Sequence, residues 1–248
     1  MEIIFWSALF LVLGYLGLRY RHLWSLYRAQ GAFKQGGLEA ALVHYSKAHN
    51  TGNMTLRMCV TYGFLLLKSG KTQEAEKVLD LQRKKRRKFS PSNPEVCLIR
   101  TYQALVEWKK GNLDTAVEIL QDHHALGYKT AAVFGSLGYF LLTKNKLNEA
   151  LIINLEAQEY DSQDKVVLDN LALNYRLLGD LKAAGEVYDR LMSLDPQFPE
   201  AWYNYGLYLK EQGSIPQAKE ALEKAKSLPL NALSTITQEE MTHALESL

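Results

Sequence analysis

LDNLALNYRLLGDLKAAGEVYDRLMSLDPQFPEAWYNYG, residues 168–206, is the stretch that decides the fold of this chain. It contains one helix pattern, a glycine turn at Gly179 and a second helix pattern that ends before Pro196. The cycle restarts at Trp202, which takes the place that Leu168 has in the cycle before. A fixed period of about 34 residues predicts helical hairpins, each of which buries its apolar face only by stacking on its neighbours.

The residues that close the hairpin turns recur along the whole chain. They are Gly36, Gly70, Gly111, Asn145, Gly179 and Gly213, and the intervals between them are equal except for a longer one from Gly70 to Gly111. Five positions after each of them lies an alanine, at Ala41, Ala75, Ala116, Ala150, Ala184 and Ala218. Glycine permits a left-handed backbone where the first helix ends. Alanine permits two antiparallel helices to approach closely, so the two positions together predict a helical hairpin.

This pattern resembles the tetratricopeptide repeat (TPR), whose period is also about 34 residues. The resemblance implies an all-α, TPR-like α-solenoid of about six helical hairpins, preceded by an apolar N-terminal helix. The repeats are expected near residues 22–55, 56–89, 97–130, 131–164, 165–198 and 199–230. Residues 231–248 are expected to form a C-terminal capping helix, which begins at the capping box Thr237-Gln-Glu-Glu240. An ordinary helical bundle would not explain the fixed period.

Two further positions of the repeat each favour one size of residue, the first small and the second large. The eighth place is small, at Ala29, Gly63, Ala104, Gly138, Ala172 and Gly206. The ring or aliphatic place of the second helix holds Tyr45, Leu79, Leu120, Tyr188 and Leu222. Asn112 and Asp180, which follow two of the turn residues, are expected to cap the next helix.

Charge divides the chain into two parts, although the formal net charge is only +2. Residues 1–90 hold 15 Lys and Arg against 5 Asp and Glu, and residues 91–248 hold 14 against 22. The first part is therefore basic (+10) and the second acidic (−8). The two cysteines, Cys59 and Cys97, lack zinc-site spacing and are expected to be small buried apolar residues.

An uncharged segment of 16 residues, Ile3–Leu18, opens the chain. As a helix it would be about 24 Å long, and flanking aromatic and arginine side chains such as Arg19 and Arg21 extend its reach. We expect residues 1–21 to be a single-pass transmembrane anchor. A cleaved signal peptide, an interfacial helix and a helix that caps the first repeat are the alternatives. Because the basic residues follow the segment, the repeats are expected on the cytoplasmic side of the membrane.

A basic run accounts for the longer interval between Gly70 and Gly111. It consists of Arg83, Lys84, Lys85, Arg86, Arg87 and Lys88 within an insertion over residues 83–96. Six adjacent cations repel one another, so an exposed helix end is the simplest interpretation. A contact with anionic lipid headgroups is the second, and nucleic acid or an acidic protein is the third.

No catalytic motif or metal-ligand spacing is present in the sequence. The adjacent His123 and His124 would point in different directions on a helix, so we expect them to stabilise the helix C-terminus instead of binding a metal. The sequence therefore predicts a protein that is not an enzyme and that needs no cofactor or metal.

In TPR-like arrays the first helices of the hairpins line a concave groove, and the resemblance assigns groove positions here. The selected residues are Arg57, Phe64, Tyr102, Tyr139, Asn170, Arg176, Tyr203 and Asn204, and further groove positions are Val60, Thr61, Leu98, Thr101, Trp108, Ser136, Asp169, Leu173, Glu200 and Leu207. Asn170 and Asn204 lie one period apart and could each bind a peptide backbone through an amide. The alternative is that these asparagines stabilise the array itself.

These expectations combine into a membrane-anchored cytoplasmic scaffold that binds a protein or peptide in the groove. The arrangement is similar to that of bacterial envelope-assembly TPR proteins, although the CxxC metal module found in one of them is missing here. The alternatives are a secreted or periplasmic TPR adaptor and an anionic partner, nucleic acid or lipid, bound by residues 83–88. Nucleic acid is the less expected of these partners, and the sequence indicates neither the partner's identity nor an oligomeric state.

Overall fold

The computed structural model describes residues 14, 27–28, 31, 37–52 and 54–248. They form helices and turns, with no strand in this part of the chain. The chain divides into two compact units, Met1–Lys88 and Phe89–Leu248. The division falls where the charge changes sign, so the first unit is the basic one and the second unit the acidic one.

Most of the first 36 residues lie outside the described part of the chain. The predicted anchor over residues 3–18, apart from residue 14, and the first helix of the first repeat, apart from residues 27–28 and 31, lie outside the described residues. Within the described ranges, no helix has both the length and the apolar composition that crossing a membrane requires.

The described part of the first unit contains three successive helices. Residues 37–50 are helical, and they are followed by α2 (Leu56–Lys68) and α3 (Thr72–Lys85). The rings of Tyr45 and Tyr62 stack with their centroids 6.0 Å apart, which joins the first of these helices to α2. α2 and α3 pack against each other as the predicted hairpin.

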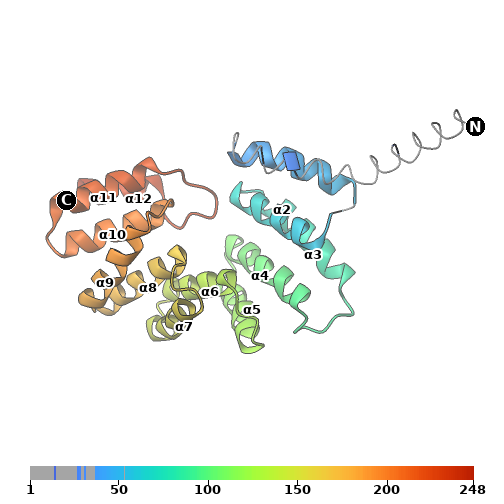
Figure 1. Cartoon of the computed structure of the whole chain (residues 1–248), viewed down its shortest axis with the longest axis horizontal. Coiled ribbons are helices and arrows are strands. Elements are labelled where there is room, and N and C mark those ends of the chain that lie inside the picture. The colour runs from blue at the N-terminus through green and yellow to red at the C-terminus, as the bar shows by residue number, and fades with distance from the viewer. Residues whose placement is uncertain (1–13, 15–26, 29–30, 32–36, 53) are drawn as a thin grey trace, which may run out of the picture. The chain divides into compact units, whose positions relative to one another are not determined.

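The second unit consists of four hairpins and a final helix (Figure 1). The hairpins are α4 (Pro94–Lys109) with α5 (Leu113–Ala125), α6 (Ala131–Thr143) with α7 (Leu147–Tyr160), α8 (Lys165–Leu178) with α9 (Leu181–Ser193), and α10 (Pro199–Glu211) with α11 (Ile215–Ser227). The last helix is α12 (Gln238–Glu246). α4 packs on α6, α6 on α8 and α8 on α10, so the first helices of successive hairpins are neighbours, as in a TPR-like solenoid.

The turn residues adopt the conformation that the sequence predicts. The backbone angle φ is positive at the five predicted turn residues that the structure describes: Gly70, Gly111, Asn145, Gly179 and Gly213. Gly36 lies outside the described residues, and its neighbour Gly37 has φ of 74°. All six alanines that follow the turns are completely buried. The hairpin prediction is therefore confirmed at each described repeat.

Caps fix the ends of several helices. The side chain of Asp180 accepts a hydrogen bond from the backbone N–H of Ala183, as predicted. Asn112 is the N-cap residue of α5, but its side-chain oxygen accepts no capping hydrogen bond, contrary to the prediction, and its amide nitrogen donates to Glu107 at 2.6 Å. The predicted capping box of α12 is present, with Thr237 and Glu240 bonded reciprocally.

Close contacts between a glycine of the first helix and a large residue of the second join the two helices of a hairpin. A Cβ atom added at Gly206 would lie 2.7 Å from Cγ of Leu222. At Gly63 the corresponding distance to Leu79 is 3.2 Å. The small eighth place of the repeat is therefore required by the bulk of the residue that faces it.

Replacing Gly206 by alanine should destabilise the last hairpin. Alanine favours helix over glycine by about 1 kcal/mol, but inserting a carbon into this contact should cost about 1–3 kcal/mol. We expect a net loss of about 1 kcal/mol in the free energy of unfolding, measured by urea denaturation. The double variant Gly206→Ala/Leu222→Ala should show a favourable coupling, since the smaller partner makes room. A single variant as stable as the parent would contradict this account.

Both cysteines are buried and free, as predicted. Cys59 lies in α2 and Cys97 in α4. Burial raises the pKa of both thiols, which keeps them protonated and unreactive.

Candidate partner-binding surface

The predicted groove residues of the second unit lie on four neighbouring helices. Tyr102 and Trp108 belong to α4, Tyr139 to α6, Arg176 to α8 and Tyr203 to α10. All five are half-buried, so each presents part of its side chain to solvent. We call these five residues the first-helix surface.

Aromatic rings predominate on α4 and α6. The rings of Trp108 and Tyr139 meet edge to face with centroids 6.2 Å apart, and Trp108 also contacts Phe140 at 5.3 Å. The ammonium group of Lys109 lies 4.8 Å from the Trp108 ring. Such rings offer wide apolar area with little loss of conformational entropy on binding.

Arg57 and Phe64, the other predicted groove residues, belong to α2 in the first unit. Arg57 is exposed, and Phe64 is half-buried beneath the ammonium group of Lys68, at 5.6 Å. They remain predicted contact residues of the first unit, and the name first-helix surface does not include them.

The structure corrects the expectation for Asn170 and Asn204. Only 4% and 8% of these residues is exposed. Asn170 donates to the backbone carbonyl of Gly135 at 2.9 Å, and Asn204 donates to the carboxylate of Asp169 at 3.1 and 3.3 Å. Each amide thus bonds to the first helix of the preceding hairpin. Their geometry supports the alternative role, in which asparagine fixes one repeat on the next.

An Asn170→Ala variant should therefore lose stability. The change removes a buried hydrogen bond to the carbonyl of Gly135, at a cost of about 1 kcal/mol. Urea denaturation of the full chain measures the difference. Asn148→Ala is a suitable control, because Asn148 is exposed on α7. Equal stability of the two variants would show that the amide does not support the array.

Buried polar groups join α8 to α6 and α7 as well. Asn174 donates to the carbonyl of Leu147 at 3.0 Å and accepts from Asn154 at 3.2 Å. Asn154 occupies the place in the second helix where other repeats have a ring or an aliphatic residue. Gly138 makes room for it, since an added Cβ would lie 2.0 Å from the Asn154 amide oxygen. Polar bonds thus replace apolar packing at this junction.

Carboxylates gather along α8 and α10. Asp169 is only 6% exposed, and its oxygens accept a bond from Asn204 alone among the described residues. Burial raises the pKa of Asp169 to about 7, and the negative charge of Glu200 adds to the effect. Arg176 donates to Glu211 at 3.0 Å instead of to Asp169. Asp169 is therefore a buried carboxylate with few hydrogen-bond donors, and Glu200 and Glu211 beside it are more exposed carboxylates.

Tyr188 lies in the core beside this cluster. It is completely buried, and its hydroxyl has no hydrogen-bond partner within the described part of the chain. Burial, followed by the charge of Asp169, raises its pKa well above the ordinary value of 10. The ring packs against Tyr205 and Tyr208, with centroids 5.5 and 5.1 Å away. The hydroxyl therefore stays protonated, and the ring serves the packing of α9 on α10.

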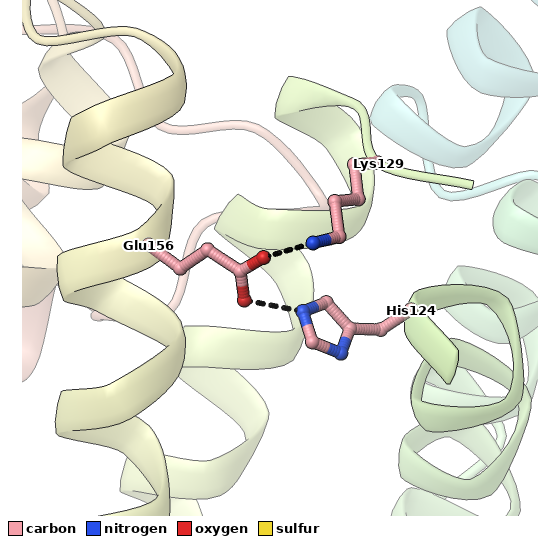
Figure 2. A network of polar contacts seen from close by, with 3 residues as sticks. All are labelled: His124, Lys129 and Glu156. Atoms are coloured by element: carbon pink, nitrogen blue, oxygen red, sulfur yellow. Dashed lines mark hydrogen bonds and ion pairs between the residues drawn. The ribbon is translucent and has the colours of Figure 1, made fainter. Parts of the chain in front are cut away.

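A polar network that the sequence did not indicate joins α5 to α7. Glu156 of α7 accepts from His124 at 2.5 Å and from Lys129, as Figure 2 shows. The bond to Lys129 is the main reason that the pKa of Glu156 falls below its ordinary value. These partners are 32 and 27 residues apart, so only the stacking of hairpins brings them together. A small open cavity of about 240 Å³ lies beside the network, lined by Gln121, His124, Leu137, Leu141, Glu149, Ile152 and Ile153.

The adjacent histidines have different environments, and only part of the prediction was right. They do point in different directions, since His124 bonds to Glu156 whereas His123 is buried, with Nδ1 3.2 Å from the hydroxyl of Thr101. Burial and the nearby Arg100 lower the pKa of His123 to about 4. An uncharged His123 cannot stabilise the helix C-terminus as a cation, so that role is wrong for this residue.

The basic run ends α3 at the end of the first unit. Lys84, Lys85, Arg87 and Lys88 are exposed, whereas Arg83 and Arg86 are half-buried. Arg86 donates to the backbone and side chain of Gln82, each at 3.3 Å, and Arg83 donates to the carbonyl of Arg86 at 3.3 Å. Two of the six cations therefore close the helix end, and four remain at the surface.

Within the described ranges, no three His, Cys, Asp or Glu side chains gather in a way that could hold a metal ion.

Comparisons with known proteins agree with this architecture. Tetratricopeptide-repeat family models match residues 167–198 and 187–220. A tetratricopeptide repeat protein from Parabacteroides merdae ATCC 43184 is similar over 92% of this chain and 84% of its own, with 14% identity and a TM-score of 0.66. YrrB, described as a TPR protein with an unusual peptide-binding site, is similar over 82% of this chain and 98% of its own, with 19% identity and a TM-score of 0.51.

A larger assembly also contains a similar chain. The Cut9–Hcn1 hetero-tetramer of APC/C matches 84% of this chain, with 14% identity and a TM-score of 0.65. The match spans only 39% of that chain. Identities this low establish the fold alone. The protein therefore contains tetratricopeptide repeats and has the all-helical fold of the proteins built from them.

Proposed function

We propose that this protein is a non-catalytic scaffold that binds a protein or peptide partner on the first-helix surface. The observation that carries the proposal is the recurrence of half-buried aromatic side chains, Tyr102, Tyr139 and Tyr203, on the first helices α4, α6 and α10, of which α4 packs on α6 and α8 packs on both α6 and α10. Partly exposed rings on the first helices of three repeats give a partner several apolar anchors along the stack. The peptide-binding site described for YrrB, which has the same fold, supports this choice.

Proximity labelling in the native cell tests the proposal. The chain carrying Tyr102→Ala, Tyr139→Ala and Tyr203→Ala should lose the partners that the parent chain labels. Tyr160→Ala is the matched control, because Tyr160 is an exposed ring at the end of α7, a second helix. Identical labelling by the parent and the triple variant would refute the assignment of the surface.

We also propose that residues 3–18 anchor the scaffold in a membrane with the repeats on the cytoplasmic side. The support is the sequence alone: 16 uncharged residues followed by Arg19 and Arg21. A role in bacterial envelope assembly would depend on this anchor. A topology reporter fused to the C-terminus should give a cytoplasmic signal, and an external signal would refute the orientation. A mature N-terminus that begins after residue 18 would instead favour the secreted or periplasmic adaptor.

An anionic partner of the basic run is the second candidate. The four exposed cations, Lys84, Lys85, Arg87 and Lys88, favour it. Replacing all six basic residues by glutamine should abolish binding to vesicles that contain anionic lipid, and to nucleic acid, and should remove the salt dependence. Unchanged binding would exclude this role for the run.

A further inference from the structure

We infer that the outer side of α7 is the interface of a symmetric dimer, in which α7 packs antiparallel on α7 of a second copy of this chain. The inference goes beyond the proposed function, because it concerns a second helix of a hairpin and not the first-helix surface. It starts from two apolar residues of α7, Ile152 and Leu155, which are 66% and 38% exposed.

The repeat shows that these two side chains are unusual. Equivalent places in the second unit are found by aligning the first residues of α5, α7, α9 and α11. In the other three second helices the places of Ile152 and Leu155 hold exposed polar residues, which are Glu118 and Gln121, Glu186 and Asp189, and Glu220 and Glu223. The stacking of hairpins therefore does not require apolar residues there, and a contact outside the array accounts for them.

The surface beside Ile152 is hollowed as well as apolar. Ile152 lines the cavity of about 240 Å³ together with Leu137 and Leu141, two buried leucines of α6. Pockets for small molecules usually measure about 300–1,000 Å³. This smaller cavity is suited to side chains of another protein, and it extends the apolar area beyond Ile152 and Leu155.

Four exposed residues form a line along α7, and we call them the α7 seam: Asn148, Ile152, Leu155 and Glu159. Steps of three and four residues place side chains on the same face of a helix. Ile152 and Leu155 lie on either side of the midpoint of α7, and a polar residue lies one turn beyond each of them. An apolar centre at this spacing is the pattern by which two helices pack along a seam.

The order of residues in the α7 seam favours a second copy as the partner and an antiparallel direction. A two-fold axis at the midpoint of α7 places Ile152 opposite Leu155 of the second copy, and Asn148 opposite Glu159 of the second copy. Apolar side chains then face each other, and each amide can donate to a carboxylate. A parallel pair would place the two Glu159 carboxylates together, where like charges repel. The α7 seam is therefore complementary to itself in the antiparallel direction.

Sedimentation equilibrium of the full chain over a series of concentrations tests the inference. The disrupting variant is Ile152→Glu/Leu155→Gln, which gives α7 the residues that α5 has at these places. The matched control is Leu177→Glu/Leu178→Gln, which makes the same change at two exposed leucines at the end of α8. Circular dichroism verifies that both variants are folded.

The parent and the control should form dimers with the same dissociation constant. The disrupting variant should raise this constant by at least about tenfold, because the apolar centre of the interface is lost. A parent that is monomeric at every concentration would overturn the inference. Equal association of all three chains would overturn it too, since the apolar segment Ile3–Leu18 is the same in each. Neither result bears on the proposed function, which the tyrosine variants test separately.

An exchange of charge tests the direction of the pairing. Asn148→Asp should weaken the dimer, because the new carboxylate faces Glu159 of the second copy. Asn148→Asp/Glu159→Lys should restore it, because opposite charges then face each other at both ends of the seam. In a parallel pair the double variant would face aspartate with aspartate and lysine with lysine. A double variant that associates no better than Asn148→Asp would therefore overturn the antiparallel interface.

Discussion

An Asp169→Asn variant should unfold less readily than the parent chain at pH 8. Asp169 is buried among α8 and α10, and only Asn204 donates to it among the described residues. At pH 8 the parent must hold a buried negative charge, whereas the variant holds a neutral amide of nearly the same shape. The gain should vanish below pH 4, where the carboxyl group is protonated in both the folded and the unfolded chain.

The sign and size follow from the raised pKa. The pKa of Asp169 is about 7 in the folded chain, against an ordinary value of 3.8, so the folded chain binds more protons between these values. Stability therefore falls as the pH rises from about 4 to 7. The full difference corresponds to about 4 kcal/mol, which is the upper limit of the expected gain.

The difference between the variant and the parent, and not the pH profile of either, is the quantity to measure. His123 acts in the opposite direction, because its lowered pKa makes the folded chain less stable as the pH falls from 6.5 toward 4. The free energy of unfolding of both chains is measured by urea denaturation at pH 4, 6 and 8. His123 contributes equally to both chains, so its contribution cancels when one value is subtracted from the other. Asp189→Asn is the control, since Asp189 is exposed on α9. A constant difference across this range would show that Asp169 does not titrate as proposed.

Tyr188 should give opposite results when it is replaced by alanine and by phenylalanine. Tyr188→Ala removes a ring that is completely buried in the cluster of Leu168, Ala172, Ala184, Leu191 and Ala201. The loss of a buried aromatic side chain costs about 3–5 kcal/mol. Tyr188→Phe keeps the ring and removes only a hydroxyl that lacks a partner within the described chain.

The phenylalanine variant should be as stable as the parent or more stable by about 1 kcal/mol, because a buried unsatisfied hydroxyl is costly. Thermal and urea unfolding of the three chains at pH 7 provide the comparison. A loss of more than about 1 kcal/mol in Tyr188→Phe would mean that the hydroxyl has a bonding partner, with Asp169, whose charge raises the pKa of Tyr188, as the candidate. In that case Tyr188→Phe and Asp169→Asn should not be additive.

The hairpins could be predicted because each depends on a local rule. Gly179 needs a left-handed backbone and Ala184 needs a close helix crossing, and both requirements return once in every repeat. The contacts between hairpins were harder to predict. Glu156 and His124 are 32 residues apart, and nothing in the sequence marks them as partners.

The candidate surface was predicted only in part, for a similar reason. The positions on the first helices could be assigned by the period, and Tyr102, Tyr139 and Tyr203 are half-buried there. The period of the repeat did not show how deeply the side chain at each position is buried. Asn170 and Asn204 occupy equivalent places and both proved to be buried, because the preceding helix offers them an acceptor: a backbone carbonyl at Gly135 and a carboxylate at Asp169. Residue type alone does not distinguish such an amide from one that faces solvent.

The stacking of each hairpin on the one before it also affects how the protein is made. In the second unit each helix packs mainly on helices close to it in the chain, such as α4 on α5 and α6, or α10 on α11. Contacts that are local in sequence form quickly and require no distant segment. The hairpins can therefore form in order during synthesis, each docking on its predecessor as it leaves the ribosome. α12 then docks on α11, the helix that precedes it in the chain.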